Sequence, residues 1–197
     1  MAFQGEAIRR LKPRLSADCA LIGFVGAPFT LYAYAVAGSH EGFARQGLPG
    51  LSSGLYAGFC EALTELLAAN MMLQAEAGAD ALALFDTAAG ALDEEGFAHH
   101  AAVPLAAVLK LFRQRYPALP VIYYSRETGP AHWQALRPLG IQCLGIDWRH
   151  DLALALTEQT PHWAVQGNID PAWLHLPAPE LEARVRGVFE HVRALPA

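Results

Sequence analysis

The sequence predicts an α/β fold with a parallel sheet, because strand and helix patterns alternate five times along its 197 residues. The expected strands are short, apolar and mostly without polar alternation, which is typical of parallel strands covered on both faces. Polar residues follow each strand at once, as they do on the active-site face of a (β/α) barrel. We therefore expect a TIM-type barrel architecture in a single domain, 1–197, since this length suits one sizeable core.

The first elements are a short helix and a buried strand. Apolar residues at helical spacing predict a helix over 4–15, which Pro13 ends. The apolar run 20–25 predicts a strand that stops at a Gly-Ala-Pro turn, because proline cannot donate to a central ladder. Thr30 and Tyr34 follow the turn in what we expect to be a loop, where parallel α/β proteins meet their ligands.

The middle of the chain continues the alternation. The Gly- and Ser-rich stretch 38–54 predicts a loop with a helical turn around Phe43. Helical spacing predicts a long helix over 55–77, and a glycine follows it as a natural stop. A strand is expected over 79–85, and then a helix over 93–116 that is broken near its internal proline.

The second half repeats the pattern with shorter elements. Apolar runs predict strands over 120–124, 143–146 and 163–165. Helical spacing predicts helices over 130–138, 151–158 and 179–195. The polar residues that follow the strands are Asp86 with Thr87, Ser125 with Arg126, Asp147, and Gln166 with Asn168 and Asp170.

Composition and charge narrow the function. The net charge is −5 with no run of like charges, which argues against nucleic acid and against an anionic membrane surface as partners. No stretch resembles a membrane span, and the N-terminus has charges where a signal peptide needs its apolar segment. The cysteines Cys19, Cys60 and Cys143 lie far apart, so we expect reduced, mostly buried thiols in a cytoplasmic protein.

Several catalytic motifs are absent from the sequence. It has no HExxH, GxGxxG or GxxxxGK[ST] pattern, which removes the usual signals for a zinc hydrolase or a nucleotide cradle. His99 and His100 are neighbours, but adjacent helical residues point to different faces, so we expect them at the surface. An acid, hydroxyl and arginine site without metal remains, which suits proton-transfer chemistry on a polar substrate.

Four motifs resemble those of the uroporphyrinogen decarboxylase family. They occur in family order and are GAPFTLYAYAVAG (26–38), ALALFDTAAGAL (81–92), GIDW (145–148) and QGNIDP (166–171). The resemblance implies a cytoplasmic (β/α)8 barrel enzyme, usually a homodimer, without metal or organic cofactor. It implies removal of the four acetate carboxyls of uroporphyrinogen III, giving coproporphyrinogen III in haem and tetrapyrrole synthesis.

The resemblance also suggests substrate-binding residues. Tyr34 matches the substrate-site tyrosine of the family and Thr87 its substrate-site Ser/Thr. Asp86 and Arg126 stand beside them at strand ends as further candidates. Asp86 and Asp147 also fit a role in ordering the strand ends, and the Gln-Gly-Asn turn fits an architectural role.

The chain departs from the family pattern in ways that leave alternatives open. The Arg-Gln-Ala-Gly-Arg motif, the site aspartate and the late Gly-His-Gly stretch are absent, so the expected catalytic Arg and Asp lie outside this chain. About five of eight βα units are expected, corresponding to strands three to seven, which makes the barrel incomplete. Arg149 stands where a small polar residue is expected, and its role stays open.

Two explanations fit these departures: the middle of a longer decarboxylase, or a naturally shortened relative that binds tetrapyrrole or a partner chain without catalysis. A corrinoid-dependent methyltransferase relative is a rival enzyme, but it would bind zinc through a His-x-Cys pair. The matching strand end here reads YYSRE, with neither residue.

Overall fold

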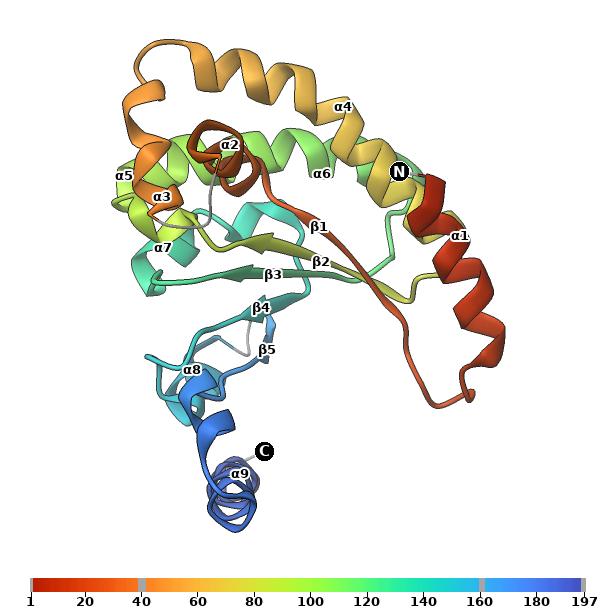
Figure 1. Ribbon diagram of the computed structural model, residues 1–197, viewed down its shortest axis with the longest axis vertical. Coiled ribbons are helices and arrows are strands. Elements are labelled where there is room, and N and C mark those ends of the chain that lie inside the picture. Colours follow the sequence, from red (N-terminus) through yellow and green to blue (C-terminus); the bar gives the residue numbers. More distant parts are fainter. Residues whose placement is uncertain (1, 39–41, 160–161, 196–197) are drawn as a thin grey trace.

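The computed structural model describes residues 2–38, 42–159 and 162–195, which form one curled, five-stranded parallel sheet with helices around it (Figure 1). The strands are β1 (Ile22–Gly26), β2 (Ala81–Asp86), β3 (Val121–Ser125), β4 (Cys143–Gly145) and β5 (Ala164–Gln166). They pair in sequence order, β1-β2-β3-β4-β5. The predicted parallel α/β fold is confirmed, and within the described residues the sheet is part of a barrel that does not close.

The register places the carboxyl ends of the strands along one edge of the sheet. Gly26 pairs with Phe85, and the next residue, Asp86, pairs with Ser125. At the other strand ends, Tyr124 pairs with Gly145, which in turn pairs with Gln166. Residues that follow successive strands are therefore brought together, although they are far apart in the sequence.

Helices α2 (Pro28–Ala37), α4 (Leu55–Glu76) and α6 (Val103–Arg115) lie together over the outer face of the sheet (Figure 1). The remaining helices are α1 (Ala2–Leu11), α3 (Phe43–Gln46), α5 (Glu94–Phe97), α7 (Pro130–Gln134), α8 (Leu152–Gln159) and α9 (Ala178–Arg193). The 3-10 segments are η1 (Lys12–Arg14), η2 (Leu48–Gly50), η3 (Ala89–Ala91), η5 (Arg137–Leu139) and η6 (Pro171–His175), and η4 (Ala98–Ala102) is a π-helical segment. The core lies between the outer helices and the side chains of Leu82, Leu84, Val121, Tyr123 and Leu144, all fully buried.

Most predicted elements are confirmed to within a few residues. The expected break near Pro104 is a π-helical turn, η4, between α5 and α6. The expected helix over 130–138 is α7 followed by η5. The expected helical turn around Phe43 is α3, and residues 39–41 of that predicted loop lie outside the described residues.

The prediction of a loop after the first strand is wrong, because that stretch is helix α2. Pro28 occupies the first turn of α2, where its missing N–H costs nothing and its fixed φ suits the helix. Gly38 ends the helix in the left-handed conformation, with φ of 63°. Thr30 therefore sits in the first turn of a helix and Tyr34 in the second, both near the end of β1.

The expectation that the sheet is covered on both faces is also wrong within the described residues. Ile22 and Phe24 of β1 are 46% and 58% exposed, and Phe85 of β2 is 41% exposed, on the inner face of the curl. The ring of Phe85 contacts Phe24 at a centroid distance of 5.9 Å and Tyr124 of β3 at 6.2 Å. We call Phe24, Phe85 and Tyr124 the aromatic row; it forms an apolar surface leading across three strands.

The free edge of β1 is sealed by a side chain. Gln74 of α4 is buried, and its Oε1 accepts a hydrogen bond of 2.9 Å from the Phe24 N–H. Its Nε2 donates a 2.9 Å hydrogen bond to the Phe24 carbonyl oxygen. The amide group of Gln74 thus takes the place that a peptide of a neighbouring strand would occupy.

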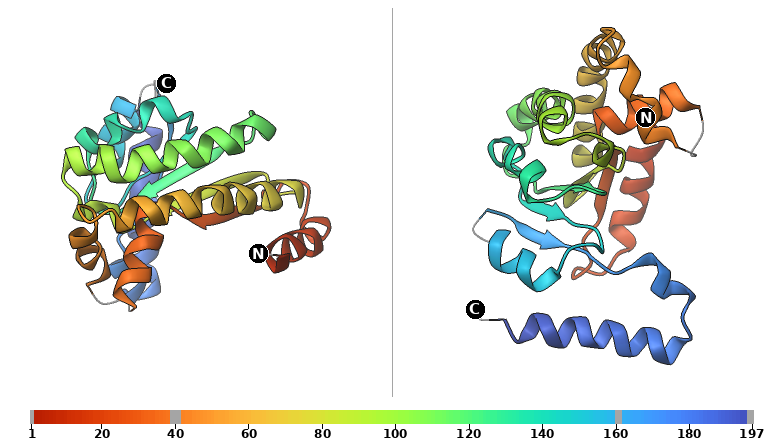
Figure 2. Two further views of the ribbon diagram at one scale, coloured as in Figure 1. Left: turned by 90° about the horizontal axis from the view of Figure 1, so that it is seen from above. Right: turned by 90° about the vertical axis from the view of Figure 1, so that its left-hand side faces the viewer.

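Helix α9 confirms the predicted helix over 179–195 but packs only along part of its apolar face. The right-hand view of Figure 2 shows α9 extending alone below the rest of the molecule. Val185 and Val188 of α9 line a groove of about 240 Å³ with Leu152 and Leu156 of α8, while Phe189 is 60% exposed. The far end of the fold is thus its least tightly packed part.

The cysteines are all free thiols. Cys60 is buried and Cys143 half-buried, but Cys19 is exposed, so the expectation of mostly buried thiols is wrong for Cys19. None of the helices in the described ranges combines the length and the apolar character that a membrane crossing requires.

Candidate functional site at the carboxyl ends of the strands

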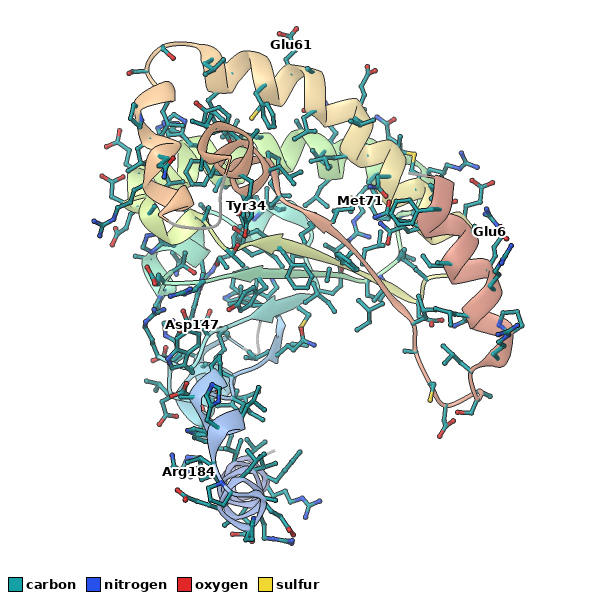
Figure 3. All side chains as sticks on the ribbon, in the orientation of Figure 1. Glu6, Tyr34, Glu61, Met71, Asp147 and Arg184 are labelled. Carbon is teal, nitrogen blue, oxygen red and sulfur yellow. The ribbon has the colours of Figure 1, made fainter. Side chains whose placement is uncertain are left out.

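The residues predicted to bind substrate lie at the carboxyl edge of the sheet. Tyr34 projects from α2 and is half-buried, and Thr87 is half-buried in the turn directly after β2. Figure 3 shows Tyr34 and Asp147 at the same end of the sheet, with Arg184 of α9 farther away. The structure therefore gathers the expected hydroxyl and acidic residues at one edge, as the sequence predicted.

Asp86 is fully buried at the centre of this edge. Its Oδ1 accepts hydrogen bonds from the Thr30 hydroxyl at 2.7 Å and from the Thr30 N–H at 3.2 Å. Its Oδ2 accepts one from the Tyr123 hydroxyl at 2.9 Å. The Thr30 oxygen also accepts a 3.0 Å hydrogen bond from the Ala88 N–H, so one carboxyl group joins α2, β2, β3 and the turn after β2.

Burial raises the pKa of the Asp86 carboxyl above its ordinary value, and the hydrogen bonds from Thr30 and Tyr123 oppose this shift. Burial also raises the pKa of the Tyr123 phenol, and the Asp86 charge adds to it, so Tyr123 remains a hydrogen-bond donor. No part of Asp86 faces solvent, and this geometry supports the ordering role rather than the substrate contact that was also predicted for it.

Asp147 orders the ends of β3 and β4 in a similar way. The buried carboxylate accepts hydrogen bonds from the N–H groups of Glu127, at 2.7 Å, and Arg149, at 2.9 Å. The Arg149 guanidinium adds a 2.6 Å hydrogen bond from Nη1. Burial alone would raise the pKa of Asp147, but the two backbone hydrogen bonds and the Arg149 charge outweigh it and hold the pKa below its ordinary value.

Four residues beside Asp147 form a charged and aromatic group that we call the arginine fork: Arg126, Glu127, Trp148 and Arg149. One oxygen of Glu127, Oε1, pairs with Arg149 Nη2 at 2.8 Å and with Arg126 Nη2 at 3.1 Å. The guanidinium carbons of Arg149 and Arg126 lie 4.9 Å and 5.6 Å from the Trp148 ring centroid. The sequence singled out Arg126 and left Arg149 open, but it gave no role to Glu127 or Trp148.

Two other strand-end groups are architectural. The Ser125 hydroxyl is buried against the Thr128 hydroxyl at 2.6 Å, and Thr128 also accepts a 3.1 Å hydrogen bond from the Trp133 indole N–H. Asn168 donates through its amide nitrogen to the carbonyl oxygens of Asp147, at 3.2 Å, and His150. These hydrogen bonds support the architectural role expected of the Gln-Gly-Asn turn.

Hollows border this edge of the sheet. A hollow of about 470 Å³ adjoins the arginine fork and is lined by Glu127, His132 and the acidic run 93–95. Another, of about 580 Å³, lies between Trp148 and α9, away from Tyr34 and Thr87. Among residues 2–38, 42–159 and 162–195, no three His, Cys, Asp or Glu side chains group closely enough to hold a metal ion.

Comparison with known proteins identifies relatives of the whole chain. The family model described as Uroporphyrinogen decarboxylase (URO-D) matches residues 1–195. A curated uroporphyrinogen decarboxylase of Novosphingobium aromaticivorans is 33% identical over 187 residues, covering 94% of this chain and 55% of the relative. One of Frankia casuarinae is 36% identical over 188 residues, covering 94% of this chain and 50% of the relative. The chain thus spans about half the length of the curated relatives it matches.

Solved structures show the same fold in other enzymes. A methyltransferase from Methanosarcina mazei superposes with a TM-score of 0.69 at 15% identity, covering 95% of this chain and 55% of that chain. A putative vitamin-B12 independent methionine synthase from Listeria monocytogenes gives 0.53 at 18% identity, covering 96% of this chain and 59% of that chain. Identities this low carry the fold and not the reaction.

Proposed function

The chain belongs to the uroporphyrinogen decarboxylase family, and from this premise we propose that it acts in the conversion of uroporphyrinogen III to coproporphyrinogen III. Each of the four acetate side chains loses its carboxyl group as CO2 and keeps a methyl group. The observation that supports this proposal most directly is the placement of Tyr34 and Thr87, which match the substrate-site residues of the family, together at the carboxyl edge of the sheet.

The chemistry assigns this chain the task of holding the substrate. Decarboxylation of a pyrrole acetate begins with protonation of a ring carbon, and loss of CO2 from the resulting cation leaves an exocyclic methylene group. That methylene carbon takes up a proton to become the methyl group, and the ring carbon releases its added proton. The hydroxyls of Tyr34 and Thr87 can hydrogen-bond a carboxylate or a pyrrole group, and Arg126 can pair with a carboxylate. We do not assign Asp86 as the proton donor, since it is enclosed by protein.

The inner face of the sheet is suited to binding a flat, partly apolar ligand. The aromatic row presents exposed rings of Phe24 and Phe85 below the strand ends, and the arginine fork stands above them at the rim. An uncharged ring surface with two arginines at its rim suits a macrocycle whose pyrroles are apolar and whose edges carry carboxylates.

Membership of the family also suggests the compartment, the cofactor requirement and the oligomeric form of the enzyme. We propose that it works in the cytoplasm without a metal or organic cofactor, and that a homodimer is its functional form. The enclosure of Asp86, which keeps this carboxyl away from a substrate, favours a second candidate, a relative that binds tetrapyrrole without turnover.

One experiment separates these candidates. Uroporphyrinogen III is incubated anaerobically with the purified 197-residue chain, and the loss of carboxyl groups is followed by chromatography. Turnover above a boiled control supports decarboxylation by this chain. Saturable binding without any loss of carboxyl groups supports the binding function and contradicts catalysis by the chain alone.

A further inference from the structure

We propose that Arg126, Arg149 and Trp148 form a binding site for a carboxylate group of the ligand, and that the Glu127 carboxylate holds the place which the ligand carboxylate takes. This proposal rests on the proposed function, because it assumes a polycarboxylate ligand on the inner face of the sheet. It assigns a role to Arg149, which the sequence left open.

The first argument is the geometry of the fork. Both guanidinium groups bind the same oxygen of Glu127, at 2.8 Å from Arg149 Nη2 and 3.1 Å from Arg126 Nη2. Two guanidiniums that converge on one carboxylate oxygen are arranged as they would be for any carboxylate. The Trp148 ring lies within 6 Å of both guanidinium carbons, which restricts where the two cations can move.

The second argument is that the Glu127 side chain faces solvent while its backbone is fixed. Its N–H is held by Asp147 at 2.7 Å, and its φ of 64° is the only positive value of a non-glycine residue among the described residues. Its side chain, in contrast, is 48% exposed and borders the hollow of about 470 Å³. Asp147 could not exchange in this way, because its side chain is 1% exposed.

The third argument is charge. Arg126, Arg149, Glu127 and Asp147 carry two positive and two negative charges, which cancel. Moving the Glu127 carboxylate away leaves one positive charge in excess, and an incoming carboxylate restores neutrality. An ordinary surface ion pair contributes little to binding energy. Two guanidinium groups that converge on one point favour an anion that contacts both of them.

The fourth argument is position. Tyr124, the last member of the aromatic row, lies in β3, and Arg126 of the fork follows it two residues later at the end of that strand. Burial and the Asp147 charge raise the pKa of the Tyr124 phenol, while Arg126 and Arg149 lower it. A ring system resting on the aromatic row can therefore extend a carboxylate to the fork. The site joins the inner face of the sheet to its carboxyl edge.

The test measures binding without turnover. Coproporphyrin III, a fluorescent tetracarboxylate, is titrated into the full chain, and its tetramethyl ester serves as the uncharged probe. Glu127→Gln removes the competing anion and is expected to tighten coproporphyrin binding about fivefold. Arg149→Met is expected to weaken it about tenfold, and neither change should alter ester binding.

A matched pair on α9 provides the control. Glu182 and Arg186 form an exposed ion pair of 2.6 Å away from the sheet, so Glu182→Gln and Arg186→Met should leave the affinity unchanged. The proposal is overturned if wild type does not bind coproporphyrin, if Glu127→Gln binds no tighter than Glu182→Gln, or if Arg149→Met binds like wild type. Arg126→Met, also expected to weaken binding, carries the test if Arg149→Met does not fold.

These outcomes are separable from those of the proposed function. A chain that shows the expected order of affinities but never releases CO2 contradicts the decarboxylation and supports the site. A chain that decarboxylates uroporphyrinogen while the Glu127 and Arg149 variants bind coproporphyrin like wild type contradicts the site alone.

Discussion

Replacing Thr30 with valine removes one hydroxyl from the buried group around Asp86 without changing the shape of the side chain. That hydroxyl donates to Asp86 at 2.7 Å and accepts from the Ala88 N–H at 3.0 Å. Because valine fills the same volume, no cavity term is expected, and the cost comes from the two lost hydrogen bonds.

The magnitude follows from these two bonds. A hydrogen bond to a charged group contributes about 1.5–3 kcal/mol, and a buried N–H left without an acceptor costs about 1–3 kcal/mol. We therefore expect Thr30→Val to lower the free energy of unfolding by about 4 kcal/mol, and Tm by about 10 °C for a domain of this size.

The measurement is urea unfolding followed by circular dichroism, with a thermal melt in parallel. Thr64→Val is the matched control, because the Thr64 hydroxyl donates only to the Cys60 carbonyl one helical turn earlier, at 2.7 Å. The control should lose less than about 1 kcal/mol. If Thr30→Val loses no more than Thr64→Val, the Asp86 group does not hold α2 to the sheet and the reasoning is refuted.

Three further changes test the edge of the sheet. Tyr34→Phe should lower kcat/KM for uroporphyrinogen about tenfold while the variant still folds, and identical kinetics would remove Tyr34 from the site. The pKa of Asp147 is lower in the folded state than in the unfolded state. The ionised Asp147 therefore stabilises the fold at a pH above its ordinary pKa of about 4, and this stabilisation is lost as the pH falls through the pKa of the folded state. The stability gap between wild type and Asp147→Asn, from urea midpoints, should thus be large at about pH 7 and small at about pH 2; a gap that does not vary with pH would contradict this. Gly90→Ala places a methyl group against the Arg126 carbonyl oxygen and should cost about 1–3 kcal/mol in urea unfolding, whereas Gly58→Ala, in open space on α4, should stabilise slightly.

The order of strands and helices could be predicted because it depends on local patterns. Apolar runs bounded by turn residues marked all five strands, and helical spacing marked the long helix α4. The helix α2 was missed because the proline at its start was interpreted as the end of a strand, although proline is equally suited to a first helical turn. Exposure of the inner face could not be predicted, since it depends on how far the sheet extends and not on any one strand.

The site was predictable only in part for a related reason. Residues that directly follow strands, such as Thr87 and Asp147, could be placed from the sequence because parallel strands share one edge. Asp86 can be buried because Thr30, 56 residues away, and Tyr123 donate hydrogen bonds to it. Only the packing of α2 and the register of the strands bring these three residues together. Glu127 and Arg149, which pair in the structure, are 22 residues apart in the sequence. The one sequence feature that pointed to this pair was the arginine directly after the Gly-Ile-Asp-Trp motif.

Because the amide of Gln74 bonds the backbone of β1, the two outer strands of the sheet, β1 and β5, differ in how readily they can pair with a strand of another copy. A copy approaching β1 would have to break both hydrogen bonds to Phe24 before its own backbone could pair there, whereas no comparable side-chain seal covers β5 among the described residues. Pairing of β5 with β1 of the next copy could repeat without limit and build a fibre, and Gln74 opposes that arrangement. Pairing of β5 with β5 would close after two copies, so within the described residues Gln74 acts against open polymerisation and not against closed pairing.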